Sequence, residues 1–213
     1  MLAHPRGDNE AMRIRAARAT ELPALQAIER AAGLMFCDIG MPEIAQYDPW
    51  PLPLMAARRD AGRIWVQAGD GDEPVAYLMA DLVDGCLQIE QVTVHPGSAR
   101  RALGRALLDH AANQAAADGL PALTLTTFAH VPWNAPYYAR CGFRILDDAE
   151  ITPGLRAIRA REAAMGADRW PRVCLRRDLK SPLGCQALRR CPASRRHALR
   201  PAQLPADPAP TAI

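Results

Sequence analysis

The feature that most constrains the fold is a strand that ends at a proline and passes through a short basic loop into a long helix. The stretch VTVHPGSARRALGRALLDHA begins as an apolar strand at Val92 and ends in an Ala- and Leu-rich segment at Ala111. Apolar residues at helical spacing predict a helix over about 103–118. The first N–H groups of a helix have no partner within it, and the helix dipole adds positive charge there. We therefore predict an anion site, suited to a diphosphate, where this helix starts.

The loop does not match two common nucleotide-binding motifs. The chain contains neither GxxxxGK[ST] nor GxGxxG followed by an acid about twenty residues later. Gly104 has no Cβ, so the backbone can approach a ligand, while Arg100, Arg101 and Arg105 add positive charge. Arginine-rich helix starts also occur on ordinary solvated surfaces. The loop alone leaves both interpretations open.

Strands and helices alternate along most of the chain. Strands are predicted at 12–17, 63–68, 74–83, 87–94, 122–128, 143–146 and 172–179, and helices at 20–32, 53–60, 103–118, 134–142 and 154–166. Short turns between the second, third and fourth strands predict an antiparallel meander. The order predicts an α/β fold of the α+β type, with three layers and helices on both faces of one central sheet.

The length of 213 residues fits one domain with an appendage. We predict a domain over 12–179, preceded by a flexible N-terminus (1–11) and followed by a basic, Pro- and Arg-rich tail (180–213) without packed structure. The net charge is +3, and most of the excess lies in the tail, so the domain itself does not favour nucleic acid as a partner. Weak contact of the tail with nucleic acid or membrane stays open.

Cysteine and histidine patterns bear on location and metal binding. The six cysteines are scattered without CxxC spacing, and the histidines show no metal-ligand spacing, so we predict no metal. The N-terminus has no apolar signal region, and no apolar run approaches the roughly 18 residues of a membrane span. The sequence therefore predicts a reducing, cytoplasmic setting and no membrane partner.

The strand ending in VHP, the Arg/Gly loop, the Ala/Leu helix, the next strand and NAPYYARCGF together resemble the GNAT family of N-acetyltransferases. The family loop pattern Q/R-x-x-G-x-G/A corresponds to 99–104, where Gly104 matches but Ala99 and Ala102 depart from it. The resemblance covers about residues 12–179. It implies a mixed, mainly antiparallel sheet that is splayed at its fourth strand. It also implies acetyl-CoA as co-substrate and direct transfer of the acetyl group to an amine, without a covalent enzyme intermediate.

The resemblance further implies which residues hold the co-substrate. Backbone groups of three strand residues would pair with the pantetheine arm: Val92, Thr93 and Val94. N–H groups of the loop and helix start would bind the pyrophosphate: Arg100, Arg101, Ala102, Leu103, Gly104 and Arg105. Asn134 is a weaker candidate for cofactor contact, because the family asparagine corresponds to Val131. Asn134 could instead cap the helix that follows it.

Direct transfer needs a group that takes a proton from the amine. A lysine-like amine has a pKa of about 10.4, so it is mostly protonated at pH 7, and a nearby carboxylate can take the proton directly or through water. Glu90, an acid in a mostly apolar strand, is our candidate, and an ion-paired strand acid is the alternative. Members of the family also carry bases on the next strand, but the matching position in this chain is Thr126, which cannot act as a base. This favours Glu90 or water.

Transfer also needs a proton donor for the departing thiolate. Tyr138, four residues before Gly142, corresponds to the family tyrosine that protonates the sulfur. A phenol with a pKa of about 10 stays protonated at neutral pH. We assign Tyr137 to packing.

The amine acceptor, a small molecule or a peptide, is expected beside 41–54 and the helix 154–166. Candidate wall and charge residues there are Glu43, Tyr47, Asp48, Trp50, Met55 and Trp133. His130 follows a strand on the acceptor side and stays an open candidate, whereas His95 is expected to bond local backbone. The alternative function is a non-catalytic acyl-CoA-binding module whose basic tail binds a partner. The sequence leaves a homodimer open.

Overall fold

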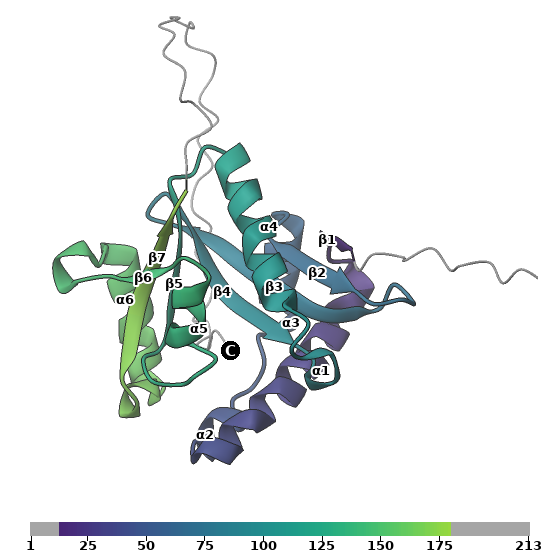
Figure 1. Cartoon of the computed structure of the whole chain (residues 1–213), viewed down its shortest axis with the longest axis horizontal. Coiled ribbons are helices and arrows are strands. Elements are labelled where there is room, and N and C mark those ends of the chain that lie inside the picture. The colour runs from purple at the N-terminus through teal and green to yellow at the C-terminus, as the bar shows by residue number, and fades with distance from the viewer. Residues whose placement is uncertain (1–12, 180–213) are drawn as a thin grey trace, which may run out of the picture.

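A computed structural model describes residues 13–179 of the chain. The predicted flexible N-terminus (1–11) and basic tail (180–213) lie outside the described residues. Within 13–179, strands and helices form one layered unit around a single sheet (Figure 1).

The sheet has seven strands within the described part of the chain. They are β1 (Ile14–Ala16), β2 (Ile64–Ala68), β3 (Pro74–Val83), β4 (Cys86–Val94), β5 (Ala122–Phe128), β6 (Arg144–Ile145) and β7 (Arg172–Asp178). Their order across the sheet is β1-β2-β3-β4-β5-β7-β6. Neighbouring strands are antiparallel except β4 and β5, which are parallel. The predicted mixed, mainly antiparallel sheet is confirmed, although β1 and β6 are shorter than expected.

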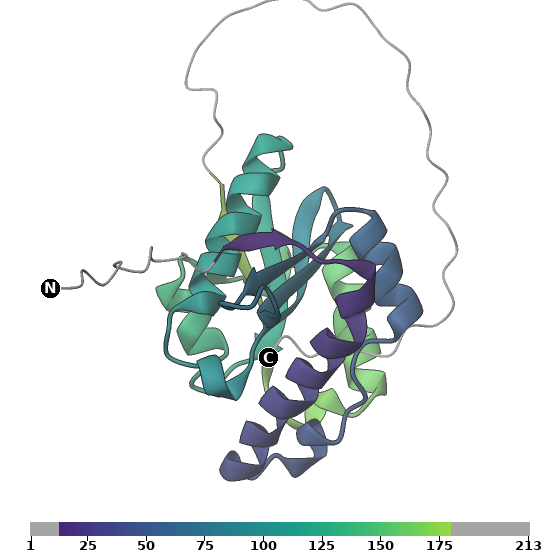
Figure 2. The same cartoon turned by 90° about the vertical axis from the view of Figure 1, so that its right-hand side faces the viewer.

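Residues 13–179 contain six α-helices. They are α1 (Leu22–Gly33), α2 (Pro42–Ala45), α3 (Leu52–Asp60), α4 (Leu103–Ala117), α5 (Ala135–Arg140) and α6 (Pro153–Ala164). A 3-10 segment, Leu34–Ile39, joins α1 to α2. Helices α4 and α5 pack on one face of the sheet, and α1, α3 and α6 on the opposite face. Figure 2 shows α1 and α4 on opposite sides of the strands. The three predicted layers are confirmed.

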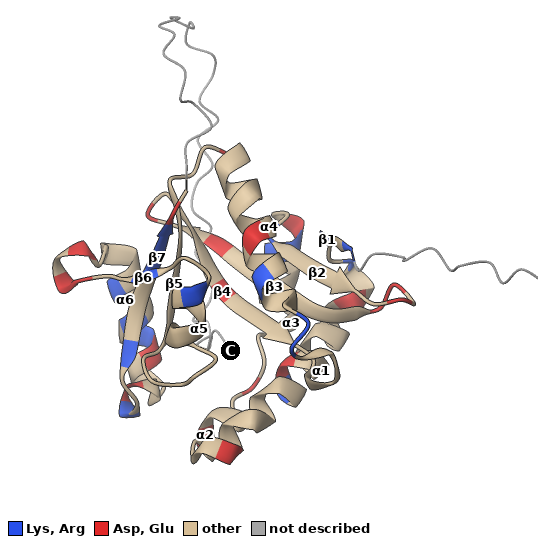
Figure 3. Cartoon of the chain, viewed as in Figure 1, with Lys and Arg blue, Asp and Glu red and all other residues tan. Residues whose placement is uncertain are grey.

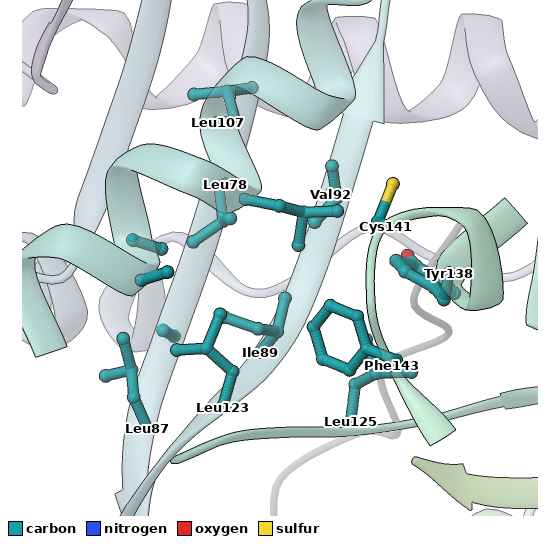
Figure 4. Packing of buried hydrophobic residues seen from close by; sticks show 14 of the residues in the cluster. Leu78, Leu87, Ile89, Val92, Leu107, Leu123, Leu125, Tyr138, Cys141 and Phe143 are labelled. Atoms are coloured by element: carbon teal, nitrogen blue, oxygen red, sulfur yellow. The ribbon is translucent and has the colours of Figure 1, made fainter. Parts of the chain in front are cut away.

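The largest core lies between α4 and the centre of the sheet. Leu107 and Leu108 of α4 are fully buried and pack with Leu78 of β3 and Val92 of β4. Figure 4 shows Leu107 above these strands, with Phe143 placed beside Tyr138. The helical spacing of apolar residues read from the sequence therefore gives the buried face of α4.

Strands β4 and β5 separate soon after they begin to pair. Their parallel register includes only Leu87 with Leu123 and Gln88 with Thr124. The Thr124 hydroxyl donates to the Gln88 side-chain oxygen at 2.7 Å, at the last paired position. Beyond it the two strand edges face a gap, which confirms the splay predicted at the fourth strand.

None of the helices in residues 13–179 is long and apolar enough to span a lipid bilayer. The same part of the chain holds no cluster of three or more His, Cys, Asp or Glu side chains that could bind a metal ion.

Candidate functional site

An apolar cavity of about 420 Å³ opens where β4 leaves β5. It extends from the C-terminal end of α1, along the last residues of β4, to the loop before α4 and the start of α5. Its lining residues are Ala32, Met35, Val92, Val94, Pro96, Ser98, Ala99, Arg100, Ala102, Leu103, Gly104, Trp133, Tyr137 and Tyr138. The cavity therefore joins the splayed strand to the helix start that the sequence singles out.

The loop before α4 has an unusual backbone. Arg100 and Ala102 have φ angles of 64° and 57°, in the left-handed region that residues with a Cβ rarely adopt. Ala102 is the N-cap of α4 and makes no side-chain cap hydrogen bond. The first N–H groups of α4 are therefore available to an external acceptor. Figure 3 shows basic residues in this loop. The loop holds the shape of a glycine-containing turn although the family glycine is replaced at Ala102.

Gly104 lies under an aromatic side chain. A Cβ at this position would come within 2.9 Å of the Tyr137 hydroxyl oxygen and 3.7 Å of a Val92 methyl group. Tyr137 is thus more than a packing residue, because it lines the cavity and lies against the start of α4. Its position next to Tyr138 was visible in the sequence, but its contact with Gly104 was not.

The residues predicted to hold the co-substrate divide into two groups. Those that line the cavity are Val92, Val94, Arg100, Ala102, Leu103 and Gly104. Thr93, Arg101, Arg105 and Asn134 are outside the lining set. Thr93 points to the α1 face, where its hydroxyl accepts a hydrogen bond from the Gln91 amide at 2.6 Å. Backbone contacts from Thr93 and from the two arginines stay predictions.

Asn134 is fully buried at the start of α5. Its side-chain amide donates to the Thr127 hydroxyl at 2.5 Å, which ties the start of α5 to the end of β5. Its side chain does not cap the helix. Its backbone carbonyl accepts from the N–H groups of Tyr137 and Tyr138. The structure thus gives Asn134 a clear part in positioning Tyr138, and its contact with a cofactor stays a prediction.

Tyr138 is buried in the core but reaches the cavity with part of its side chain. Its ring packs edge-on against Phe143, with ring centres 5.7 Å apart. Burial raises the pKa of Tyr138, so the hydroxyl stays protonated at neutral pH. The Tyr137 hydroxyl lies next to the Cys141 thiol. Both tyrosines line the cavity, and the role of Tyr138 as proton donor stays a prediction.

Glu90 occupies a bulge in β4. Gln91 pairs with Met79 and Ile89 with the next residue of β3, which leaves Glu90 as the extra residue. Its carboxylate accepts two hydrogen bonds from Arg58 of α3, at 2.8 and 2.9 Å. The ion pair that the sequence left open as an alternative is present. Glu90 faces the α3 side of the sheet and is not part of the cavity lining.

A second carboxylate, which the sequence did not single out, approaches the splay from α6. Glu162 is fully buried and accepts hydrogen bonds from Thr126 of β5, from Arg172 of β7 at 3.0 and 2.8 Å, and from Arg159 at 2.7 Å. Glu90 and Thr126 both lie on the unpaired stretches of β4 and β5, beyond Gln88 and Thr124. Each of these two strands therefore carries a charged network: Glu90 with Arg58 on β4, and Glu162 with Thr126 on β5.

A third buried carboxylate lies beneath β4. Glu29 of α1 accepts a hydrogen bond from the Tyr77 hydroxyl at 2.8 Å, and the Trp50 backbone also bonds it. Burial raises the pKa of Glu29 to about 7. Tyr77 in turn is bonded to Thr93, between the two valines that line the cavity. The sequence analysis did not single out Glu29. The signal that could have found it is an acidic residue on the apolar face of the predicted helix 20–32.

Residues expected on the acceptor side are divided between two places. Trp50 and Met55 are buried between α1, α3 and the sheet. Tyr47 and Trp133 pack in an aromatic cluster with Phe36, where the rings of Phe36 and Trp133 meet edge-on at 5.6 Å.

Three other predicted residues can be located. Glu43 is ion-paired with Arg169, and Asp48 is exposed. The His95 side chain accepts a hydrogen bond from the Gly97 N–H at 3.1 Å, which confirms its expected local role.

The fold and the site together define the class of the protein. A sheet splayed between two parallel strands, an apolar cavity along the freed strand edge and an uncapped helix N-terminus at one end are the features of a CoA-dependent acyltransferase. Residues 25–143 match the family model of the acetyltransferase (GNAT) family, and the chain belongs to that family. It is therefore an N-acetyltransferase, with acetyl-CoA as its co-substrate.

Several solved structures share this fold. A GNAT acetyltransferase from Staphylococcus aureus has 15% sequence identity and a TM-score of 0.60, covering 80% of this chain and 100% of that one. PaiA N-acetyltransferase from Thermoplasma acidophilum, in complex with coenzyme A, has 12% identity and a TM-score of 0.54, covering 78% and 98%. N-acetylglutamate synthase from Neisseria gonorrhoeae has 16% identity and a TM-score of 0.58, covering 79% of this chain. The present chain spans 35% of the length of that synthase.

Proposed function

We propose that the protein transfers an acetyl group from acetyl-CoA directly to a primary amine of a small molecule or peptide, within a complex that holds both substrates. The observation that carries the proposal is the cavity along the unpaired end of β4, which reaches the uncapped N-terminus of α4. The cytoplasmic location stays a prediction from the scattered cysteines.

The start of α4 fits a diphosphate. Free N–H groups, the positive end of the helix dipole and the arginines of the loop all favour an anion at this point. Gly104 keeps the backbone approachable, because any side chain there would fill the space beneath Tyr137. In this proposal the N–H groups from Arg100 to Arg105 bind the diphosphate of the co-substrate.

The freed edge of β4 fits the pantetheine arm. Beyond Gln88, β4 has no partner strand on the β5 side, so the backbone groups of Val92, Thr93 and Val94 can pair with amide groups of an extended ligand. Trp133 also lines the cavity, and its indole N–H is buried without a partner among residues 13–179. A buried donor without a partner costs about 1–3 kcal/mol, so an acceptor on the ligand would relieve this cost.

Acetyl-CoA supplies the thioester whose carbonyl carbon the amine attacks. Tyr138 would give its proton to the departing sulfur, since burial keeps its hydroxyl protonated and Asn134 fixes the start of its helix. Glu90 would take the proton from the amine, directly or through water, from its place on the unpaired stretch of β4. Arg58 keeps this carboxylate oriented in the bulge of β4.

Direct transfer is supported by the state of the cysteine beside the cavity. Cys141 is buried, and its thiol is hydrogen-bonded to Tyr137. Burial raises the pKa of Cys141, so the thiol stays protonated and is a poor nucleophile. Cys141 therefore does not favour a covalent acetyl-enzyme, and in this proposal the amine attacks the thioester directly.

An assay of thiol release from acetyl-CoA, run with a panel of primary amines, tests the proposal. We expect amine-dependent release, with kcat lowered roughly 100-fold in Tyr138→Phe and little changed in Tyr137→Phe. Coenzyme A binding without release for any amine would instead favour the non-catalytic acyl-CoA-binding module. Equal losses in the two tyrosine variants would remove Tyr138 from the role of acid.

A further inference from the structure

A second cavity of about 360 Å³ lies on the acceptor side of the molecule. It is formed by three segments that are far apart in the sequence: the 3-10 turn after α1, the end of β5 with the turn that follows it, and the residues before β7. The lining residues that matter here are Ile39, Met41, Phe128, His130, Val131 and Trp170. Its volume is within the range of about 300–1,000 Å³ that is usual for ligand pockets.

The second cavity adjoins the cofactor cavity through one aromatic wall. Val131 lines the second cavity and Trp133, two residues later, lines the first. Phe36 fills the space between them, with its ring 5.8 Å from Phe128 and 5.6 Å from Trp133. Phe128 ends β5, the strand that faces the splay. The second cavity is therefore lined by the last residue of the strand that faces the splay.

The chemistry of the walls defines what the cavity can hold. Its lining is apolar and aromatic apart from His130, which is exposed at the strand end. Charged side chains close by are held in ion pairs and are not part of the lining: Arg169 pairs with Glu43 and stacks on Trp170, and Arg172 pairs with Glu162 and stacks on Phe128. Because the lining itself holds no Asp, Glu, Lys or Arg, an uncharged apolar group is favoured.

We infer that the second cavity binds a large apolar or aromatic group of the amine acceptor, with His130 as its one polar contact, and so selects arylalkylamines over small amines. This inference rests on the proposed function, since it assigns the acceptor of the same reaction. The aromatic group enters between Met41 and Trp170. The amino group is then directed past Phe128 towards the splay.

A matched pair of amines tests the inference. The ratio of kcat/KM for 2-phenylethylamine to that for ethylamine isolates the contribution of the phenyl ring. We expect a ratio of roughly 10 to 100 in the unaltered protein, which is the discrimination that an apolar pocket usually provides. Ile39→Asp, which places a charge at the exposed edge of the cavity, should lower the ratio at least fivefold and leave the KM for acetyl-CoA unchanged.

The control is Ile145→Asp, since Ile145 is also an exposed isoleucine but lies on β6, outside both cavities. It should leave the ratio unchanged. A ratio near 1 in the unaltered protein, or equal effects of the two variants, would overturn the inference while the proposed function stands.

If neither amine is acetylated, the cavity is tested by binding alone, and the amine panel described above still decides the proposed function. Ligand-observed NMR should then show 2-phenylethylamine bound to the unaltered protein and to Ile145→Asp, and more weakly to Ile39→Asp. Absence of binding would overturn the inference in that case.

Discussion

The carboxylate of Glu90 and the guanidinium of Arg58 form a two-point ion pair across the α3 face of the sheet. Nε of Arg58 lies 2.8 Å from one carboxylate oxygen and a terminal nitrogen lies 2.9 Å from the other. Arg58 also contacts Asp81 at 2.9 Å. Both partners of the Glu90–Arg58 pair are about nine-tenths buried. The pair joins α3 to the bulge of β4 and holds the carboxylate that we propose as base.

Removal of Arg58 should therefore destabilise the protein. Arg58→Met removes the cation that pairs with the buried Glu90 carboxylate, and we expect the free energy of unfolding to fall by about 3 kcal/mol in urea denaturation. Arg63→Met is the control, because Arg63 is more exposed and pairs only with Asp81 among these acids. Its cost should be about 1 kcal/mol or less. Equal costs would show that the Glu90 contact contributes little.

Glu90→Gln tests the chemical role separately from the structural one. Glutamine keeps the shape of the side chain and can still bond Arg58, but it cannot accept a proton from the amine. We expect kcat to fall roughly 100-fold, with the KM for acetyl-CoA unchanged and the acidic limb of the pH–rate profile lost. A profile with its acidic limb intact would assign the base to water or to another group.

The backbone conformation of Ala102 predicts a variant that is more stable than the unaltered protein, in contrast to Arg58→Met. A residue with a Cβ pays about 1–2 kcal/mol in the left-handed region, and glycine does not. Ala102→Gly should therefore stabilise the protein by up to about 1 kcal/mol after the greater freedom of glycine in the unfolded chain is counted. Ala106→Gly, at an exposed position within α4, should instead cost about 0.5–1 kcal/mol. Thermal unfolding of the two variants checks the difference in sign.

Glu29 makes stability depend on pH. Its pKa is raised from 4.5 to about 7, so between these values the folded protein binds more protons than the unfolded chain. The stabilisation is complete below about pH 4.5 and is lost as pH rises to about 7, by roughly 3 kcal/mol. Glu29→Gln removes the titrating group, so the free energy of unfolding should vary less with pH between about 4.5 and 7.

Urea denaturation at pH 5 and pH 8 measures the effect of Glu29. Glu73→Gln is the control, at an acid on the turn before β3. In this variant the free energy of unfolding should differ between pH 5 and pH 8 by the same amount as in the unaltered protein. If Glu29→Gln keeps the same difference in the free energy of unfolding between pH 5 and pH 8, groups other than Glu29 cause the pH dependence.

The sequence predicted the elements whose pattern is local. The apolar spacing of Leu103, Leu107 and Ala111 defines α4, and the turn residues between strands predict the meander. It also placed the splay correctly, through the family resemblance. The ion-pair partner of Glu90 could not be predicted, because Arg58 is 32 positions away in the sequence, in a helix whose placement depends on packing.

The remaining features were missed for the same physical reason. Glu162 stands out in the sequence only as one more charge on a helix, and its role appears when β5 and β7 bring Thr126 and Arg172 against it. The second cavity combines three separated segments, so no single stretch of sequence carries its signal. Tyr137 was assigned to packing, and its position against Gly104 depends on how α5 docks onto α4.

The central claim is that the N-terminus of α4 binds the diphosphate of acetyl-CoA, and calorimetric titration with coenzyme A tests it most directly. The account predicts one site per chain, with affinity reduced at least tenfold in Gly104→Ala and partly restored in Gly104→Ala combined with Tyr137→Phe, because loss of the hydroxyl makes room for the added methyl group. Pantetheine, which has no diphosphate, should bind much more weakly. Absence of heat with coenzyme A, or equal affinities for coenzyme A and pantetheine, would contradict the claim.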